Sequence, residues 1–152
     1  MMATAIMMHT AAYARDSLGI FDEWGAFRDP ATGSAQLRCY AIAEPESGGG
    51  SIRYVTIGFW PTARVRGQVH VRLAQPVAAA QTVTLSVGGR RFALRTRGTG
   101  AWAADARADA AIVAAIRSSQ SLSVSNGVVN ARWRLRGAAT AIDAAALGCA
   151  GQ

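Results

Sequence analysis

Residues 83–97 read VTLSVGGRRFALRTR, and this stretch decides the fold class. Apolar and polar side chains alternate on both sides of Gly88-Gly89, and a period of two predicts half-buried β-strands. The glycine pair fits the two-residue turn of a β-hairpin. The strand after the turn is expected to point Phe92 and Leu94 at the core and its arginines at solvent: Arg91, Arg95 and Arg97.

Similar patterns occur along the rest of the chain. Strands are predicted around Cys39, over 52–60, where Pro61 ends the run, over 69–73 and over 121–125. Asn126-Gly127 predicts a turn into a last strand. That strand, over 131–136, is expected to bury Trp133 and Leu135 and to expose Arg132, Arg134 and Arg136. Trp102, which follows the Gly98-Thr99-Gly100 break, is also expected in the core.

Two segments have a helical period instead. Apolar residues over 105–117 share one helical face, and Asp105 or Asp109 can cap its N-terminus. Residues 140–143, TAID, have the form of a capping box and predict a short C-terminal helix that begins there.

Residues 15–35 are expected to be irregular, because glycine and proline interrupt them. Their aromatic residues Phe21, Trp24 and Phe27 fit either a short helical turn or a loop pinned to the core. The sum is seven or eight short strands and two short helices. We therefore expect one mainly β domain over 15–152, an antiparallel β-sandwich or barrel with two short helices.

The ends of the chain bear on where the protein resides. Residues 1–14 carry no charged side chain and end in Ala12-Tyr13-Ala14, which fits the small-x-small rule for signal-peptidase cleavage. We expect a truncated signal peptide here; the alternative is a buried N-terminal strand or helix. Cys39 and Cys149 are the two cysteines, and in an oxidising compartment they most simply pair. A periplasmic or secreted location follows, with no membrane span.

The sequence offers little material for catalysis. The two histidines are His9 and His70, too few for a Cys-His or Ser-His-Asp centre once His9 leaves with a signal and His70 faces solvent. Paired cysteines leave no ligand set for zinc. We expect no catalytic residues, no metal and no cofactor. A carboxylate-based hydrolase stays as an alternative, because the chain has nine acidic residues.

Every basic side chain is arginine, and 16 of them against nine acids give a formal charge of +7. Arginine forks suit phosphate and carboxylate, so a surface for nucleic acid or anionic polysaccharide is one interpretation. Compositional bias in a chain rich in alanine, arginine and glycine is the interpretation we favour, because the arginines are scattered. Six of them form the candidate anion-binding set on two strand faces: Arg91, Arg95, Arg97, Arg132, Arg134 and Arg136.

The second half of the chain, about residues 85–149, resembles the invasion-associated locus B family of α-proteobacteria. The similarity lies in residues 100–103 (GAWA), the helical segment 109–117 (DAAIVAAIR), the strand 122–125 (LSVS) and residues 133–143 (WRLRGAATAID). The resemblance implies an exported β-sandwich protein, and some members of the family are linked to host-cell invasion. Together with the missing catalytic groups, it predicts a non-catalytic periplasmic accessory or binding protein. Its partner is expected to be a protein or an anionic ligand, and nucleic acid is the less favoured choice.

Overall fold

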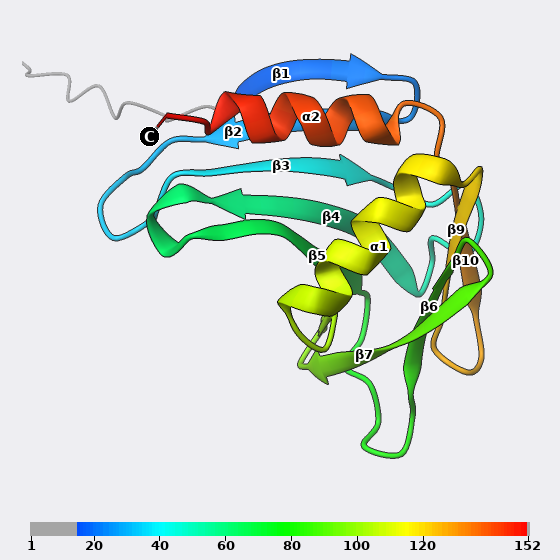
Figure 1. The fold of residues 1–152 in the computed structure, drawn as a ribbon. Helices are drawn as coiled ribbons and strands as arrows, with labels where there is room; N and C mark the ends of the chain where they lie inside the picture. The colour runs from blue at the N-terminus through cyan, green and yellow to red at the C-terminus, as the bar shows by residue number, and fades with distance from the viewer. Residues whose placement is uncertain (1–14, 152) are drawn as a thin grey trace, which may run out of the picture.

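The computed structural model describes residues 15–151, which form a mainly β protein with two helices (Figure 1). The sequence-based expectation of fold class is confirmed, although the strands number ten in the described part of the chain. The elements are β1 (Asp16–Phe21), β2 (Trp24–Asp29), β3 (Arg38–Ala43), β4 (Ile52–Trp60), η1 (Pro61–Ala63), β5 (Val65–Leu73), β6 (Val83–Val87), β7 (Arg90–Arg97), β8 (Gly100–Trp102), α1 (Ala106–Ser118), β9 (Ser121–Ser125), β10 (Asn130–Arg134) and α2 (Ala138–Gly148).

All ten strands belong to one antiparallel sheet with the order β1-β2-β3-β4-β5-β8-β7-β6-β9-β10. The sheet does not close into a barrel. It bends where β8 and β7 follow β5, so that β6, β7, β9 and β10 turn away from the plane of the long strands (Figure 1). The arrangement is sandwich-like, because apolar side chains from both parts of one sheet meet in a single core.

Both helices pack on the same side of the long strands (Figure 1). We call this side the inner face; it carries Cys39, Ala41, Val55, Val69 and Val71, which are all buried. The opposite side of β2–β5 and β8 has no helix over it among the described residues, and we call it the open face. It carries Phe27, Tyr40, Thr56, His70 and Trp102.

Two tryptophans fasten the last strand to the beginning of the sheet. The indole N–H of Trp24 in β2 donates to the carbonyl of Arg134, and that of Trp133 in β10 donates to the carbonyl of Ala43, both at 2.9 Å. The backbone of Arg132 also exchanges hydrogen bonds with the loop after β3, through Glu46 and Ser47. These contacts cover the edge strand β10, whose free backbone groups would otherwise invite pairing with another chain. The predicted burial of Trp133 is confirmed.

A disulfide joins Cys39 in β3 to Cys149, which follows α2, with a Cα–Cα distance of 5.9 Å. The pairing expected from the sequence is confirmed. It links positions 110 residues apart and holds the C-terminal helix against the inner face, where Ala141, Ile142 and Ala145 are buried.

Two local predictions were wrong. Residues 15–35 are not a helical turn or a loop: they contain the hairpin β1–β2, whose turn places Asp22 at a φ of 54°. The C-terminal helix begins at Ala138 and not at Thr140. Gly137, with a φ of 85°, is the N-cap residue, and no side chain caps the helix. A side chain at Gly137 would collide with the carbonyl of Phe21, so the tight contact between the two hairpin regions requires glycine there.

The predicted N-terminal signal, residues 1–14, lies outside the described residues. None of the helices in the described part of the chain is long and apolar enough to cross a membrane.

Candidate anion-binding cleft

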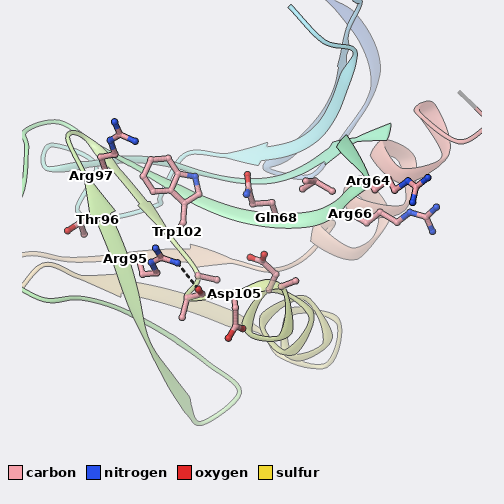
Figure 2. A pocket seen from close by; sticks show the side chains of 13 residues that line it. Arg64, Arg66, Gln68, Arg95, Thr96, Arg97, Trp102 and Asp105 are labelled. Carbon is pink, nitrogen blue, oxygen red and sulfur yellow. Dashed lines mark hydrogen bonds between the residues drawn. The ribbon is translucent and has the colours of Figure 1, made fainter. Parts of the chain in front are cut away.

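A cleft of about 850 Å³ opens beside β5, where β8 ends and α1 begins (Figure 2). Arg95 and Arg97 of β7 lie at one end of it, Arg64 and Arg66 at the other, and Trp102 with Gln68 lies between them. The remaining lining residues come from the start of α1, the segment before it and two strand positions: Val65, Thr96, Ala103, Ala104, Asp105, Ala106 and Asp109.

The cleft exists because β8 is only three residues long. It pairs with residues 70–72 of β5, so the first part of that nine-residue strand has β4 on one side and no strand on the other. The first turns of α1 occupy this position instead. The carboxylate of Asp109 accepts a hydrogen bond from the backbone N–H of Val69 at 2.9 Å, and Asp105 caps the helix by accepting from Ala108 at 2.8 Å. The predicted Asp105 cap is confirmed.

Burial raises the pKa of Asp109, the hydrogen bond from Val69 opposes the rise, and the neighbouring charge of Asp105 adds to it. Each of the two carboxylates therefore has a structural partner. Asp109 accepts from the N–H of Val69 on the side of β5 that has no strand, and Asp105 accepts from the N–H of Ala108 at the start of α1.

Four exposed arginines give the cleft its charge: Arg64, Arg66, Arg95 and Arg97. None of them takes part in the ion pairs found within residues 15–151. Arg95 donates to the carbonyl of Ala104 at 3.1 Å, which orients its guanidinium at the rim. Guanidinium groups without a carboxylate partner keep their donors available for an anion.

Trp102 was expected in the core, and this prediction was wrong. It lies half-buried in the cleft, while its neighbour Ala101 takes the buried position. The register of the β7–β8 hairpin explains the difference, because Arg95 pairs with Trp102 and Arg97 with Gly100. Cross-strand partners share a face. Trp102 must therefore lie on the same face as the arginines that the sequence already assigned to solvent.

His70 lies beside Trp102 on the open face, with ring centroids 5.0 Å apart, and Tyr54 meets the other side of the imidazole at 6.3 Å. The pKa of His70 is lowered, first because burial disfavours the charged form and then because Arg72 and Arg38 repel it. The imidazole is therefore neutral at neutral pH. It acts as an aromatic neighbour of Trp102 and adds no positive charge to the cleft.

The six arginines predicted as an anion-binding set do not stay together. Strands β7 and β10 belong to the same sheet, but β6 and β9 lie between them. Arg95 and Arg97 line the cleft, whereas Arg91 faces solvent further along β7. On β10, Arg132 and Arg134 both pair with Glu46, at 3.5 and 2.6 Å. The sixth, Arg136, pairs with Asp22 at 3.6 Å.

Sequence reasoning missed Arg64 and Arg66, and it described the arginines as scattered. Charge segregation along the chain is the signal that would have found them. Residues 47–104 hold eight arginines and no acidic residue, whereas the rest of the chain holds eight arginines against nine acids. The formal charge of +7 therefore arises from the segment that contains β4 to β8.

The groups that line the cleft are chemically suited to contact with an anion. Arginine forks match the oxygens of carboxylate, sulfate or phosphate groups. The indole offers an apolar surface beside them. Within residues 15–151, no three His, Cys, Asp or Glu side chains come close enough together to hold a metal ion.

No family model, no curated protein and no solved structure matches this chain.

Proposed function

We propose that this protein is a non-catalytic binding protein of an extracytoplasmic compartment and that it holds a negatively charged ligand in the cleft beside β5. The observation that carries the proposal is the group of four arginines, with no acidic partner within residues 15–151, around one half-buried tryptophan. Four like charges on one cleft repel each other, and an anion bound among them relieves that repulsion.

The proposed location rests on the disulfide and on the family resemblance. Disulfides persist in oxidising compartments and are rare in the cytosol. Two of the segments that carry the resemblance to the invasion-associated locus B family, residues 100–103 and 109–117, supply Trp102, Ala103 and Asp109 to the cleft. The resemblance supports an exported protein, and its motifs are ones of packing.

A carboxylate-based hydrolase is less well supported. Asp105 and Asp109 both lie at the cleft, but each carboxylate already accepts a backbone hydrogen bond. The raised pKa of Asp109 follows first from its burial at the start of α1. A general acid or base must lie within hydrogen-bond reach of the substrate, and these carboxylates are turned toward the backbone.

Retention on a heparin column tests the proposal. The double variant Arg64→Ala, Arg95→Ala removes two charges from the cleft, and Arg53→Ala, Arg91→Ala removes two exposed charges that do not line it. We expect the unmodified protein to be retained at physiological salt and the cleft variant to elute at clearly lower salt than the control variant. Equal losses in the two variants would mean that net charge alone causes retention, and no retention of the unmodified protein would overturn the proposal.

A further inference from the structure

We infer that the cleft is one end of a longer binding track, which crosses the open face from Trp102 to Trp60 and binds an extended acidic polysaccharide in which only some of the sugar rings carry carboxylates. The inference rests on the proposed function, since it assigns the ligand class of the same cleft. Its basis is a repeated arrangement of glycine and aromatic side chains on the open face, together with the distribution of charge along that face.

Strand pairing aligns these side chains in rows across the open face. One row runs from Arg95 through Trp102 and His70 to Thr56. The next row pairs Gln68 with Gly58 and continues to Tyr40 and Phe27. Gln68 also lines the cleft, so the second row begins where the cleft ends.

Three aromatic rings on this face lie across a glycine two residues earlier in the same strand: Phe27 over Gly25, Trp60 over Gly58 and Trp102 over Gly100. A Cβ atom at Gly58 would come within 2.5 Å of the Trp60 ring, and one at Gly25 within 2.7 Å of Phe27. None of these glycines has a positive φ, so they are needed for space and not for backbone conformation. Each ring therefore lies flat on its strand. The Arg15 guanidinium lies over the Phe27 ring, 5.8 Å from its centroid, so the two tryptophans are the rings that a ligand would contact.

A second hollow, of about 490 Å³, lies at the other end of the track and repeats the composition of the cleft. Trp60 lines it together with Arg15, Arg38 and Gln36. Asp29 partly neutralises the two arginines, with contacts of 3.9 and 2.9 Å. Both ends thus combine a half-buried tryptophan, arginine and a glutamine amide.

The two flat indoles are far enough apart to contact different monomers of one chain. Gly58 and Gly100, over which they lie, are separated by two strand spacings and four residues along the strand, which is about 16 Å in a regular sheet. A single small anion would touch only one of them. An extended polymer would touch both.

The charge distribution favours a polysaccharide over a nucleic acid. Arg72, which pairs with Gly100 beneath the Trp102 ring, and Arg38, which lines the second hollow, add positive charge at the two ends. Between the ends, the side chains of Gln68, Thr56 and His70 carry hydrogen-bonding groups, and the lowered pKa of His70 keeps its imidazole neutral. A nucleic acid carries a phosphate at every monomer and needs cations along its whole path. A hydroxyl-rich chain with carboxylates binds to amides and hydroxyls in the middle and to arginines at the ends. The apolar side of a sugar ring also fits a flat indole.

Calorimetric titration with hyaluronan oligosaccharides of two to eight sugar residues, which carry a carboxylate on every second ring, tests the inference on the full chain. We expect the dimer to bind weakly at the cleft and the affinity to rise about tenfold once the oligomer spans both tryptophans. Gly58→Ala lifts the Trp60 ring without changing any charge, so it should reduce the affinity for the octamer to near that for the dimer and leave dimer binding unchanged. Gly50→Ala is the matched control, because Gly50 has open space around it and no positive φ.

Trp60→Ala gives the same expected result and decides the matter if Gly58→Ala fails to fold. Affinity that does not change with oligomer length, or an unaltered octamer affinity in Trp60→Ala, would overturn the track while the cleft proposal stands. Tighter binding of oligothymidylate than of a hyaluronan oligosaccharide of equal length at equal salt would overturn the polysaccharide assignment. Absence of binding to heparin and to every oligomer would overturn the proposed function itself, and the track with it.

Discussion

Removal of the Trp133 side chain should destabilise the protein far more than removal of Trp102. Trp133 is 1% exposed, and its indole N–H donates to the carbonyl of Ala43. Trp133→Ala therefore removes packing contacts, leaves a cavity and leaves the buried Ala43 carbonyl without its donor. Truncation of such a residue costs about 3–5 kcal/mol. Trp102 is half-buried on the open face, so Trp102→Ala should cost about 1 kcal/mol from the lost burial.

In a chain of this length, each kcal/mol shifts the melting temperature by about 3 °C. We expect Trp133→Ala to melt about 10–15 °C below the unmodified protein and Trp102→Ala only about 3 °C below it. Thermal unfolding followed by far-ultraviolet circular dichroism measures both, with the disulfide kept oxidised in every sample. Trp133→Phe separates the two causes, since the ring remains largely packed while the acceptor at Ala43 loses its donor, at about 1–3 kcal/mol.

Equal shifts in the two alanine variants would contradict the assignment of faces. That result would mean that β8 and β10 point their tryptophans into the same environment. A larger shift in Trp102→Ala would reverse the assignment and remove the aromatic side chain from the cleft.

Three further outcomes are expected from the structure. Cys149→Ala should lower the free energy of unfolding by about 2–4 kcal/mol, and the unmodified protein, denatured without reductant, should contain no titratable thiol because Cys39 is paired. Asp109→Ala should cost about 1–3 kcal/mol, measured by urea unfolding, because the N–H of Val69 loses its acceptor, whereas Asp109→Asn should cost less since an amide oxygen can still accept. His70 has a pKa below its unfolded value of 6.5, so folding favours the neutral form and stability should fall as the pH drops below about 6.5; urea midpoints of His70→Gln should lack this part of the decline.

Local sequence patterns were sufficient to predict the parts of the fold that depend on residues close together in the chain. The hairpin around Gly88-Gly89, the facing of Trp133 and the helix capped by Asp105 were all predicted, because alternation, turn residues and capping act within a few positions. The same rules contained the correct position of Trp102. A two-residue turn at Gly98-Thr99 pairs Arg95 with Trp102 and places both on one face.

The N-terminal hairpin could not be predicted in this way. Its glycines and aromatics resemble a loop in composition, and Gly25 is present because the Phe27 ring lies on it, which only the folded arrangement reveals. The placement of β8 between β5 and β7 is equally inaccessible to local pattern, since it joins segments separated by some thirty residues. The cleft depends on that placement. Arg64 and Arg66 can therefore be recognised as site residues only when the sheet order is known.

The arginine-only composition has two explanations, and the structure bears on the choice between them. Compositional bias alone would leave paired and unpaired arginines mixed over the surface. In the described residues, seven arginines form ion pairs, and they lie just before β1, in β2, in β3, at the end of α1, in β10 and between β10 and α2. The segment from β4 to β8 has eight arginines and no acid to pair with them along its own length.

Self-repulsion in that segment destabilises the compact state unless something compensates for it. Acids are available elsewhere in the chain, and Glu46 shows how one of them neutralises two arginines of β10. Asp105 and Asp109 lie at the cleft itself, yet both are bonded to backbone N–H groups and neither forms an ion pair with the arginines around them. The fold therefore leaves the positive charge at the cleft uncompensated where compensation was within reach, and an anionic ligand is the partner that such an arrangement fits.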